Sequence, residues 1–161
     1  FQKYIKILKK VEVKSGSKIV RVVPFDQTLI TSEINFEHKV IGKQSISILL
    51  NPNIYKTQIC SARTFGFLNQ VDNLRKQGLA LGGSLDNAVV LDDHKVVNSE
   101  GLRFSDEFVR HKVLDFIGDI SLGGFKILGS FFTSSSGHEM NFKLLEKIFD
   151  SQSNWKIVYS N

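Results

Sequence analysis

A histidine and an aspartate four residues apart, His111 and Asp115, are the clearest candidates for chemistry in this sequence. The residues around them have the apolar spacing of a helix, and on a helix this interval stacks an imidazole and a carboxylate one turn apart. Both side chains could then reach a single metal ion. The same interval is common in surface ion pairs, so spacing alone leaves two interpretations open. The pair faces away from the apolar side of its helix, which favours a role outside the core.

Another histidine, His138, follows a segment rich in Ser and Gly, where a strand is expected to give way to a helix. The N-terminus of a helix disfavours a charged imidazolium, so a proton-donating histidine there would need a carboxylate nearby. Asp119 is the candidate if the two predicted helices meet; otherwise His138 is an ordinary residue at a helix start. His38 and His94 lie in loop-like segments, and we expect both at the surface.

The helix that carries the His/Asp pair is predicted over 105–121. We expect Ser105 to be its N-cap, and Asp106 and Glu107 to complement the positive end of the helix dipole. Apolar residues at helical spacing predict its buried face: Val109, Val113, Phe116, Ile117 and Ile120.

Strands rich in β-branched residues are predicted through the first third of the chain and again near its end. They are expected at 4–13, 18–23, 29–36, 45–50, 125–132 and 155–159, with a hairpin turn at 14–17. Pro52 is expected to begin a helix that runs to about residue 62. A last helix is predicted over 138–150, with a core stripe of Phe142, Leu145 and Phe149.

The segment at about 64–91 differs in its residue pattern from the strands before it, and it predicts a compact strand–helix–strand insertion. Strands followed by helices indicate an α+β fold, a mostly antiparallel sheet with helices packed on one face, to which this insertion is added. The length of 161 residues suits one domain, 1–161.

The charge is uneven along the chain, because residues 1–50 hold nine Lys/Arg and only four Asp/Glu. Such a region could face nucleic acid, a phosphorylated substrate, an anionic membrane surface or an acidic partner, although a solvated Lys-rich strand face explains it equally well. No RNA-binding signature is present, so we expect no nucleic-acid partner. No apolar run is long enough to cross a bilayer, and the single Cys60 favours a reducing compartment.

Several motifs, in order along nearly the whole chain, resemble the C-terminal half of the LpxC family of UDP-3-O-acyl-N-acetylglucosamine deacetylases. The matching segments are RTFGF at 63–67, GLALGGSLDNA at 78–88, LRF at 102–104, DEFVRHKVLD at 106–115, GD at 118–119 and SGH at 136–138. The resemblance implies a zinc-dependent amide hydrolase of lipid A synthesis, monomeric when full length.

The resemblance also implies roles at the reacting centre. His111 and Asp115 would be two of three zinc ligands, and Thr64 would steady the oxyanion of the reaction. His138 would be the general acid, held and charged by Asp119. These roles suit amide hydrolysis, which needs an activated water, an electrophile for the carbonyl oxygen and an acid for the departing amine.

Substrate contacts are implied as well. Lys112 would contact a substrate phosphate, Phe65 would contact the substrate, and Phe36 resembles the aromatic residue near the uracil. The insertion would form the hydrophobic passage for the 3-O-acyl chain, lined by Leu68, Val71, Ala80, Gly83 and Val90. Two positions depart from the family pattern, since Ser135 stands where Lys is common and Asn35 where Asp is common.

The family's N-terminal half, which carries the third zinc ligand and the Glu that acts as general base, has no match here. We therefore expect this chain to be the second domain, separated from the first, with the missing domain as its partner. Alone it should bind zinc weakly and lack useful activity. The resemblance places the activity in the cytoplasm of a bacterium with an outer membrane. The alternatives are a non-catalytic module that binds the nucleotide sugar and acyl chain, and a basic nucleic-acid-binding domain.

Overall fold

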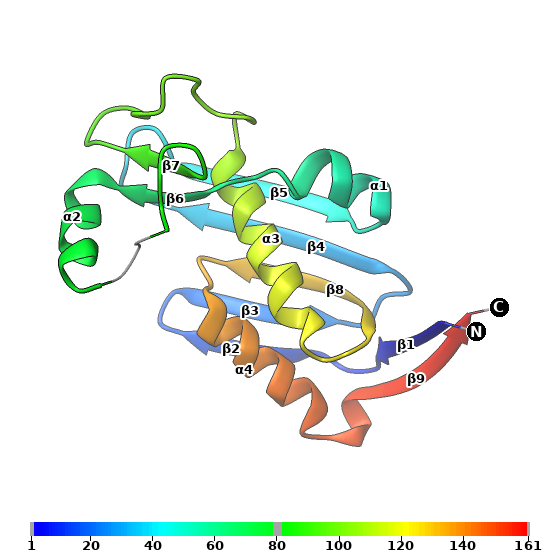
Figure 1. The fold of residues 1–161 in the computed structure, drawn as a ribbon. Coiled ribbons are helices and arrows are strands. Elements are labelled where there is room, and N and C mark those ends of the chain that lie inside the picture. The colour runs from blue at the N-terminus through cyan, green and yellow to red at the C-terminus, as the bar shows by residue number, and fades with distance from the viewer. Residues whose placement is uncertain (1, 79–81, 161) are drawn as a thin grey trace.

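The computed structural model describes residues 2–78 and 82–160. A seven-stranded sheet forms the body of the molecule, and a smaller two-stranded sheet lies beside it (Figure 1). The strands of the large sheet are β1 (Gln2–Ile7), β2 (Val11–Ser15), β3 (Lys18–Val23), β4 (Thr28–Asn35), β5 (Lys43–Leu49), β8 (Lys126–Ser134) and β9 (Trp155–Ser160).

Strand β8 is the centre of the large sheet. It pairs antiparallel with β3 and parallel with β4 and β1. The remaining pairs, β2 with β3, β4 with β5 and β1 with β9, are antiparallel. The sheet is therefore mixed and mostly antiparallel, as the sequence predicts.

Two long helices, α3 (Glu107–Ser121) and α4 (His138–Phe149), lie side by side across one face of this sheet (Figure 1). Alternate residues of β8 point at them, because successive side chains of a strand face opposite ways. The ring of Phe131 on β8 meets that of Phe116 on α3 edge to face, with centroids 5.2 Å apart. Leu144 and Ile148 of α4 complete this fully buried layer. The predicted α+β class, with helices on one face, is confirmed.

A close approach in this core requires a glycine at position 129. A Cβ added there would lie 2.7 Å from Cγ2 of Val22 and 3.0 Å from Cγ1 of Ile7. Both neighbours are fully buried in the main core. Even an alanine would therefore have to displace packed side chains.

The insertion consists of β6 (Thr64–Phe67), α2 (Leu68–Lys76) and β7 (Ala88–Leu91), and the two strands pair in parallel. It projects from one end of the large sheet in Figure 1. A second buried cluster joins it to the body, in which Val89 and Leu91 of β7 pack with Phe108 of α3. The predicted strand–helix–strand insertion is confirmed.

Some local predictions are wrong, each because tertiary contacts override local preference. The strand expected at 4–13 is two strands with different partners, because β1 pairs with β8 and β9 whereas β2 pairs with β3. Phe142 is exposed rather than part of the core stripe of α4. The buried residues of that helix are Met140, Asn141, Leu144, Leu145 and Ile148.

Details of the helices also differ from expectation, although Pro52 begins a helix as predicted. The N-cap of α3 is Asp106 rather than Ser105, and its side chain makes no capping bond, because its carboxylate pairs with Arg110 at 2.5 Å. The helix expected at 52–62 is a short α1 (Pro52–Ile54), continued by a π-helical turn, η1 (Tyr55–Ile59). A short 3₁₀ turn, η2 (Gln152–Asn154), precedes β9.

Across residues 2–78 and 82–160, no helix is long and apolar enough to cross a membrane.

Candidate metal-binding and proton-transfer site

The imidazole of His111 and the carboxylate of Asp115 face each other on α3, with Nε2 and Oδ1 3.1 Å apart. On the other side of the ring, Nδ1 lies 3.1 Å from the carbonyl oxygen of Ala62. Because a carbonyl only accepts, this contact places a proton on Nδ1 and leaves the lone pair of the neutral ring at Nε2. Both side chains are only 15% and 18% exposed.

The local electrostatics favour the charged forms of this pair. Burial by itself disfavours the imidazolium of His111, but hydrogen bonds to the Asp115 carboxylate and the Ala62 carbonyl outweigh it and raise the pKa of His111. Burial likewise opposes the charge of Asp115, but hydrogen bonding to His111 and the positive charges of His111, Lys112 and His138 lower the pKa of Asp115. Without a metal, each group therefore favours the charged form of the other.

The donor atoms of this pair suit a zinc ion. Imidazole nitrogen and carboxylate oxygen are zinc ligands, and metal-binding histidines commonly donate their other N–H to a carbonyl, as His111 does to Ala62. Within the part of the chain that the structure describes, no group of three or more His, Cys, Asp or Glu side chains is placed to hold a metal. The pair thus fits as two ligands of an incomplete set.

His138 begins α4 and meets Asp119 of α3, so the two helices come together, which was the condition for Asp119 to be its carboxylate partner. Its Nδ1 lies 3.0 Å from Oδ1 and 2.8 Å from Oδ2 of Asp119. The imidazole is 71% exposed, whereas the carboxylate is only 17% exposed. A histidine placed in this way has one nitrogen bound to an anion and the other open to solvent.

Sequence reasoning missed a third residue at this contact, Asn141. Its amide Nδ2 donates to Oδ2 of Asp119 at 2.9 Å, and its Oδ1 accepts from the hydroxyl of Ser136 at 3.0 Å. The signal that could have found it is its spacing, because residues three apart on a helix share a face and His138 lies three before it.

A buried ion pair between Arg63 and Glu107 was also missed. The carboxylate of Glu107 has no solvent exposure and accepts from the backbone N–H and side chain of Arg63 and from the backbone N–H of Arg103. The prediction that Glu107 serves the helix dipole is therefore incomplete, since its main contact is this pair. The pair joins the first turn of α3 to the chain just before Thr64, which begins β6 with its side chain exposed.

Phe65, on the first strand of the insertion, lies near His111 and near the other predicted aromatic residue, Phe36. The ring centroid of Phe65 is 6.5 Å from that of His111 and 5.6 Å from that of Phe36. Lys112 is half-buried and its Nζ lies 3.5 Å from Oδ2 of Asp115.

His38 is not the simple surface residue expected, because Nε2 donates to the carbonyl of Asp92 at 2.7 Å and Nδ1 accepts from the N–H of Val40.

The predicted passage residues are spread over the insertion. Leu68 is 46% exposed, Val71 and Val90 are half-buried, and Gly83 is exposed. Ala80 lies outside the described residues.

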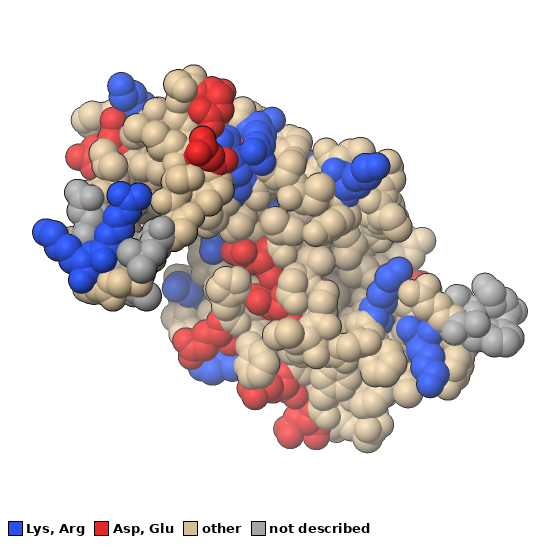
Figure 2. Space-filling model, in the orientation of Figure 1, with Lys and Arg blue, Asp and Glu red and all other residues tan. Residues whose placement is uncertain are grey.

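Figure 2 shows acidic side chains over the region of α3 and α4, and basic ones over α2, which ends with Arg75 and Lys76.

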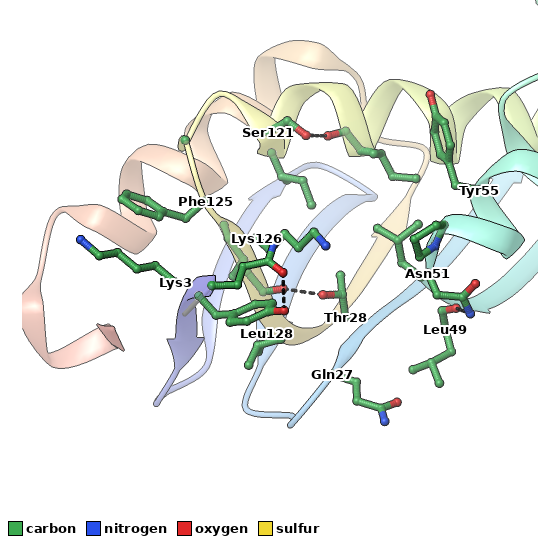
Figure 3. A pocket seen from close by; sticks show the side chains of 18 of the residues that line it. Lys3, Gln27, Thr28, Leu49, Asn51, Tyr55, Ser121, Phe125, Lys126 and Leu128 are labelled. Atoms are coloured by element: carbon green, nitrogen blue, oxygen red, sulfur yellow. Dashed lines mark hydrogen bonds between the residues drawn. The ribbon is translucent and has the colours of Figure 1, made fainter. Parts of the chain in front are cut away.

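A cavity of about 1280 Å³ lies elsewhere (Figure 3). It opens between α3 and the start of β8, where Thr28, Tyr55 and Phe125 border it. His111, Asp115, Asp119 and His138 are not among the described residues that line it. The cavity is therefore separate from the candidate site.

An α+β domain that combines a His/Asp pair with the donor atoms of metal ligands and a carboxylate-bound histidine has features found in metal-dependent hydrolases. Residues 1–150 match the family described as LpxC, UDP-3-O-acyl N-acetylglycosamine deacetylase. The chain therefore belongs to the LpxC family.

Curated relatives agree with this assignment. A UDP-3-O-acyl-N-acetylglucosamine deacetylase of Nautilia profundicola is 50% identical over 157 residues, which cover 98% of this chain and 53% of the relative. Those of Syntrophus aciditrophicus and Pasteurella multocida are 46% and 45% identical over 96% and 98% of this chain. These matches cover 49% and 52% of the two relatives, so the chain spans about half the length of the proteins it matches.

Proposed function

We propose that this chain supplies the second half of a zinc-dependent deacetylase that removes the N-acetyl group from UDP-3-O-acyl-N-acetylglucosamine. The proposal rests on family membership and on one observation above all: His111, anchored by Ala62, presents Nε2 beside the carboxylate of Asp115. The third zinc ligand and the general-base glutamate would come from polypeptide outside residues 1–161.

His111 and Asp115 would hold the zinc ion. Zinc, when bound, activates a water molecule and polarises the amide carbonyl of the substrate. The anchor on Nδ1 keeps the imidazole in the tautomer that offers Nε2, so the ring does not have to reorient for binding. The hydroxyl of Thr64, exposed at the start of β6, would donate to the developing oxyanion.

His138 would protonate the departing amine. Its Nδ1 is occupied by Asp119, so the proton to be transferred lies on the exposed Nε2. The carboxylate stabilises the imidazolium that the acid form requires, although the N-terminus of α4 disfavours it. An imidazole can both hold and donate a proton, which suits this task.

The substrate would lie along the aromatic residues and the insertion. Phe36 and Phe65 would contact the nucleotide end, and Lys112 a phosphate. The apolar residues Leu68, Val71 and Val90 would border the acyl chain, with Ala80 and Gly83 leaving room for it. The curated relatives come from bacteria, and we place this activity in the cytoplasm of a bacterium with an outer membrane.

The test is to fuse the chain at Phe1 to the first half of the Nautilia profundicola relative and to measure acetate release from the UDP-linked substrate. The fused protein should deacetylate the substrate, and the chain alone should be slower by at least about 100-fold, because one ligand and the base are missing. A folded, zinc-loaded fusion that binds the substrate without turnover would contradict the proposal and favour a non-catalytic binding module. Equal turnover by the chain alone would contradict the division of the site.

A further inference from the structure

The buried amide of Asn141 has no part in the roles described so far. It lies in the first turn of α4, is 3% exposed, and is hydrogen-bonded at both ends. The hydroxyl of Ser136 donates to the amide oxygen, so the amide NH₂ group faces the carboxylate of Asp119. The opposite orientation would place two oxygens against each other, which fixes the amide in this arrangement.

We propose that Asn141 is a positioning residue which, oriented by Ser136, holds the Asp119 carboxylate so that it fixes the imidazole of His138. The role of that imidazole in catalysis rests on the function proposed above; the hydrogen-bond chain itself does not.

The structure explains why such a support is needed. His138 is 71% exposed, so little packing restrains its ring, and its orientation depends on the carboxylate. Oδ2 of Asp119 accepts from Nδ2 of Asn141 at 2.9 Å and from Nδ1 of His138 at 2.8 Å. Two donors on one oxygen define the plane of the carboxylate.

The spacing of these residues along the sequence explains the arrangement. His138 and Asn141 are three residues apart, so both side chains lie on the side of α4 that meets Asp119 on α3. Ser136 lies just before the helix, where its hydroxyl reaches the amide oxygen. Four side chains thus form one chain of hydrogen bonds, in the order Ser136, Asn141, Asp119 and His138.

The test measures the tautomer of His138 in the chain 1–161 by ¹⁵N NMR, at a pH where the ¹⁵N shifts themselves show a neutral ring. In the unsubstituted chain the Nδ1–H form should dominate, because Nδ1 faces the carboxylate. Asn141→Ala should lower the ratio of the Nδ1–H to the Nε2–H form by about threefold or more. Ser136→Ala should shift the ratio in the same direction by less.

Ile148→Val is the matched control, because it loosens the buried face of the same helix without touching these hydrogen bonds. It should leave the ratio unchanged. If Asn141→Ala fails to fold, Ser136→Ala at its half-buried position carries the test. An unchanged tautomer ratio in folded Asn141→Ala, or in Ser136→Ala where that variant carries the test, would overturn the proposal.

A kinetic measurement on the fused protein separates this inference from the proposed function. Asn141→Ala should lower kcat by about tenfold with little change in KM, because it disturbs proton transfer and not substrate binding. Unchanged kcat would overturn the positioning role. An inactive unsubstituted fusion would count against the proposed function, while the NMR result still decides whether Asn141 positions His138.

Discussion

Nε of Arg63 lies 2.9 Å from Oε1 of Glu107, and the glutamate side chain has no solvent exposure. The guanidinium also reaches Glu100 and the carbonyl of Gly101. This ion pair joins the first turn of the helix that carries His111 to the segment that carries Thr64. It is therefore a structural support for the candidate site, formed by residues far apart in the sequence.

Substituting Glu107→Gln should destabilise the fold by about 3–5 kcal/mol, because the change removes the buried carboxylate that pairs with the buried guanidinium of Arg63 and leaves it only the more exposed Glu100. Chemical denaturation of the chain measures the loss. Glu139→Gln, which removes an exposed carboxylate on α4, is the control and should change stability little. A loss for Glu107→Gln as small as the control's would contradict a structural role for the pair.

The same pair predicts how stability depends on pH. Burial opposes the charge of Glu107, but its hydrogen bonds to Arg63 and Arg103 outweigh this and lower its pKa. A carboxyl group with a lowered pKa in the folded state stabilises the fold above its unfolded pKa of about 4.3, and that stability is lost as the pH falls through the folded value. The free energy of unfolding should thus decline below about pH 4, and decline less steeply in Glu107→Gln. If the free energy of unfolding fell equally steeply with pH in both proteins, Glu107 would not be the cause of the decline.

Zinc binding by the chain should weaken as the pH falls. The metal needs the neutral imidazole of His111, whose pKa is raised by Asp115 and the Ala62 carbonyl despite burial. Below that pKa, protons should compete with zinc and lower the apparent affinity by about tenfold per pH unit. Calorimetric titration between about pH 6 and about pH 8 measures this. The exposed His94→Ala variant is the control, and a pH-independent affinity would contradict the assignment.

Removing the proposed acid should slow deacetylation by the fused protein. His138→Ala should lower kcat by about 10²- to 10⁴-fold, and Asp119→Asn by a smaller factor, because the imidazole remains but its anionic partner is lost. KM should change little in both. Steady-state kinetics with the UDP-linked substrate provide the measurement, and unchanged kcat in His138→Ala would exclude this residue as the acid.

Gly129→Ala should cost about 1–3 kcal/mol, because the added Cβ would meet Val22 and Ile7 in the core. Gly118→Ala is the matched control: it lies within α3, and its added Cβ would meet nothing within 4 Å. That change should be neutral or stabilise by about 0.5–1 kcal/mol. Thermal unfolding measures the stability of both variants. Equal stability changes at the two positions would contradict the close approach at Gly129.

The parts of the site that the sequence predicted depend on local spacing. His111 and Asp115 share a face because helical residues four apart do so, and the phase of α3 also turns Asp119 toward the second helix. The periodicity of the strands likewise predicted the sheet and the insertion. These features need only the geometry of single elements.

The parts that the sequence did not predict depend on contacts between distant segments. Glu107 looks like an ordinary residue at a helix start, and only the fold brings Arg63 against it. Phe142 has the right character for a core, but the way α4 packs against the sheet leaves it exposed and buries Leu144 and Ile148. The first predicted strand is divided for the same reason, because β1 pairs with β8 and β9 whereas β2 pairs with β3.

The most direct test of the account is the zinc content of the fused protein and of its His111→Ala and Asp115→Ala variants, measured by elemental analysis after dialysis. The unsubstituted fusion should retain about one zinc per molecule, and each variant should lose most of it, because a ligand set of three does not hold the ion tightly with one removed. Folded variants that keep their full zinc content would show that this helix does not bind the metal.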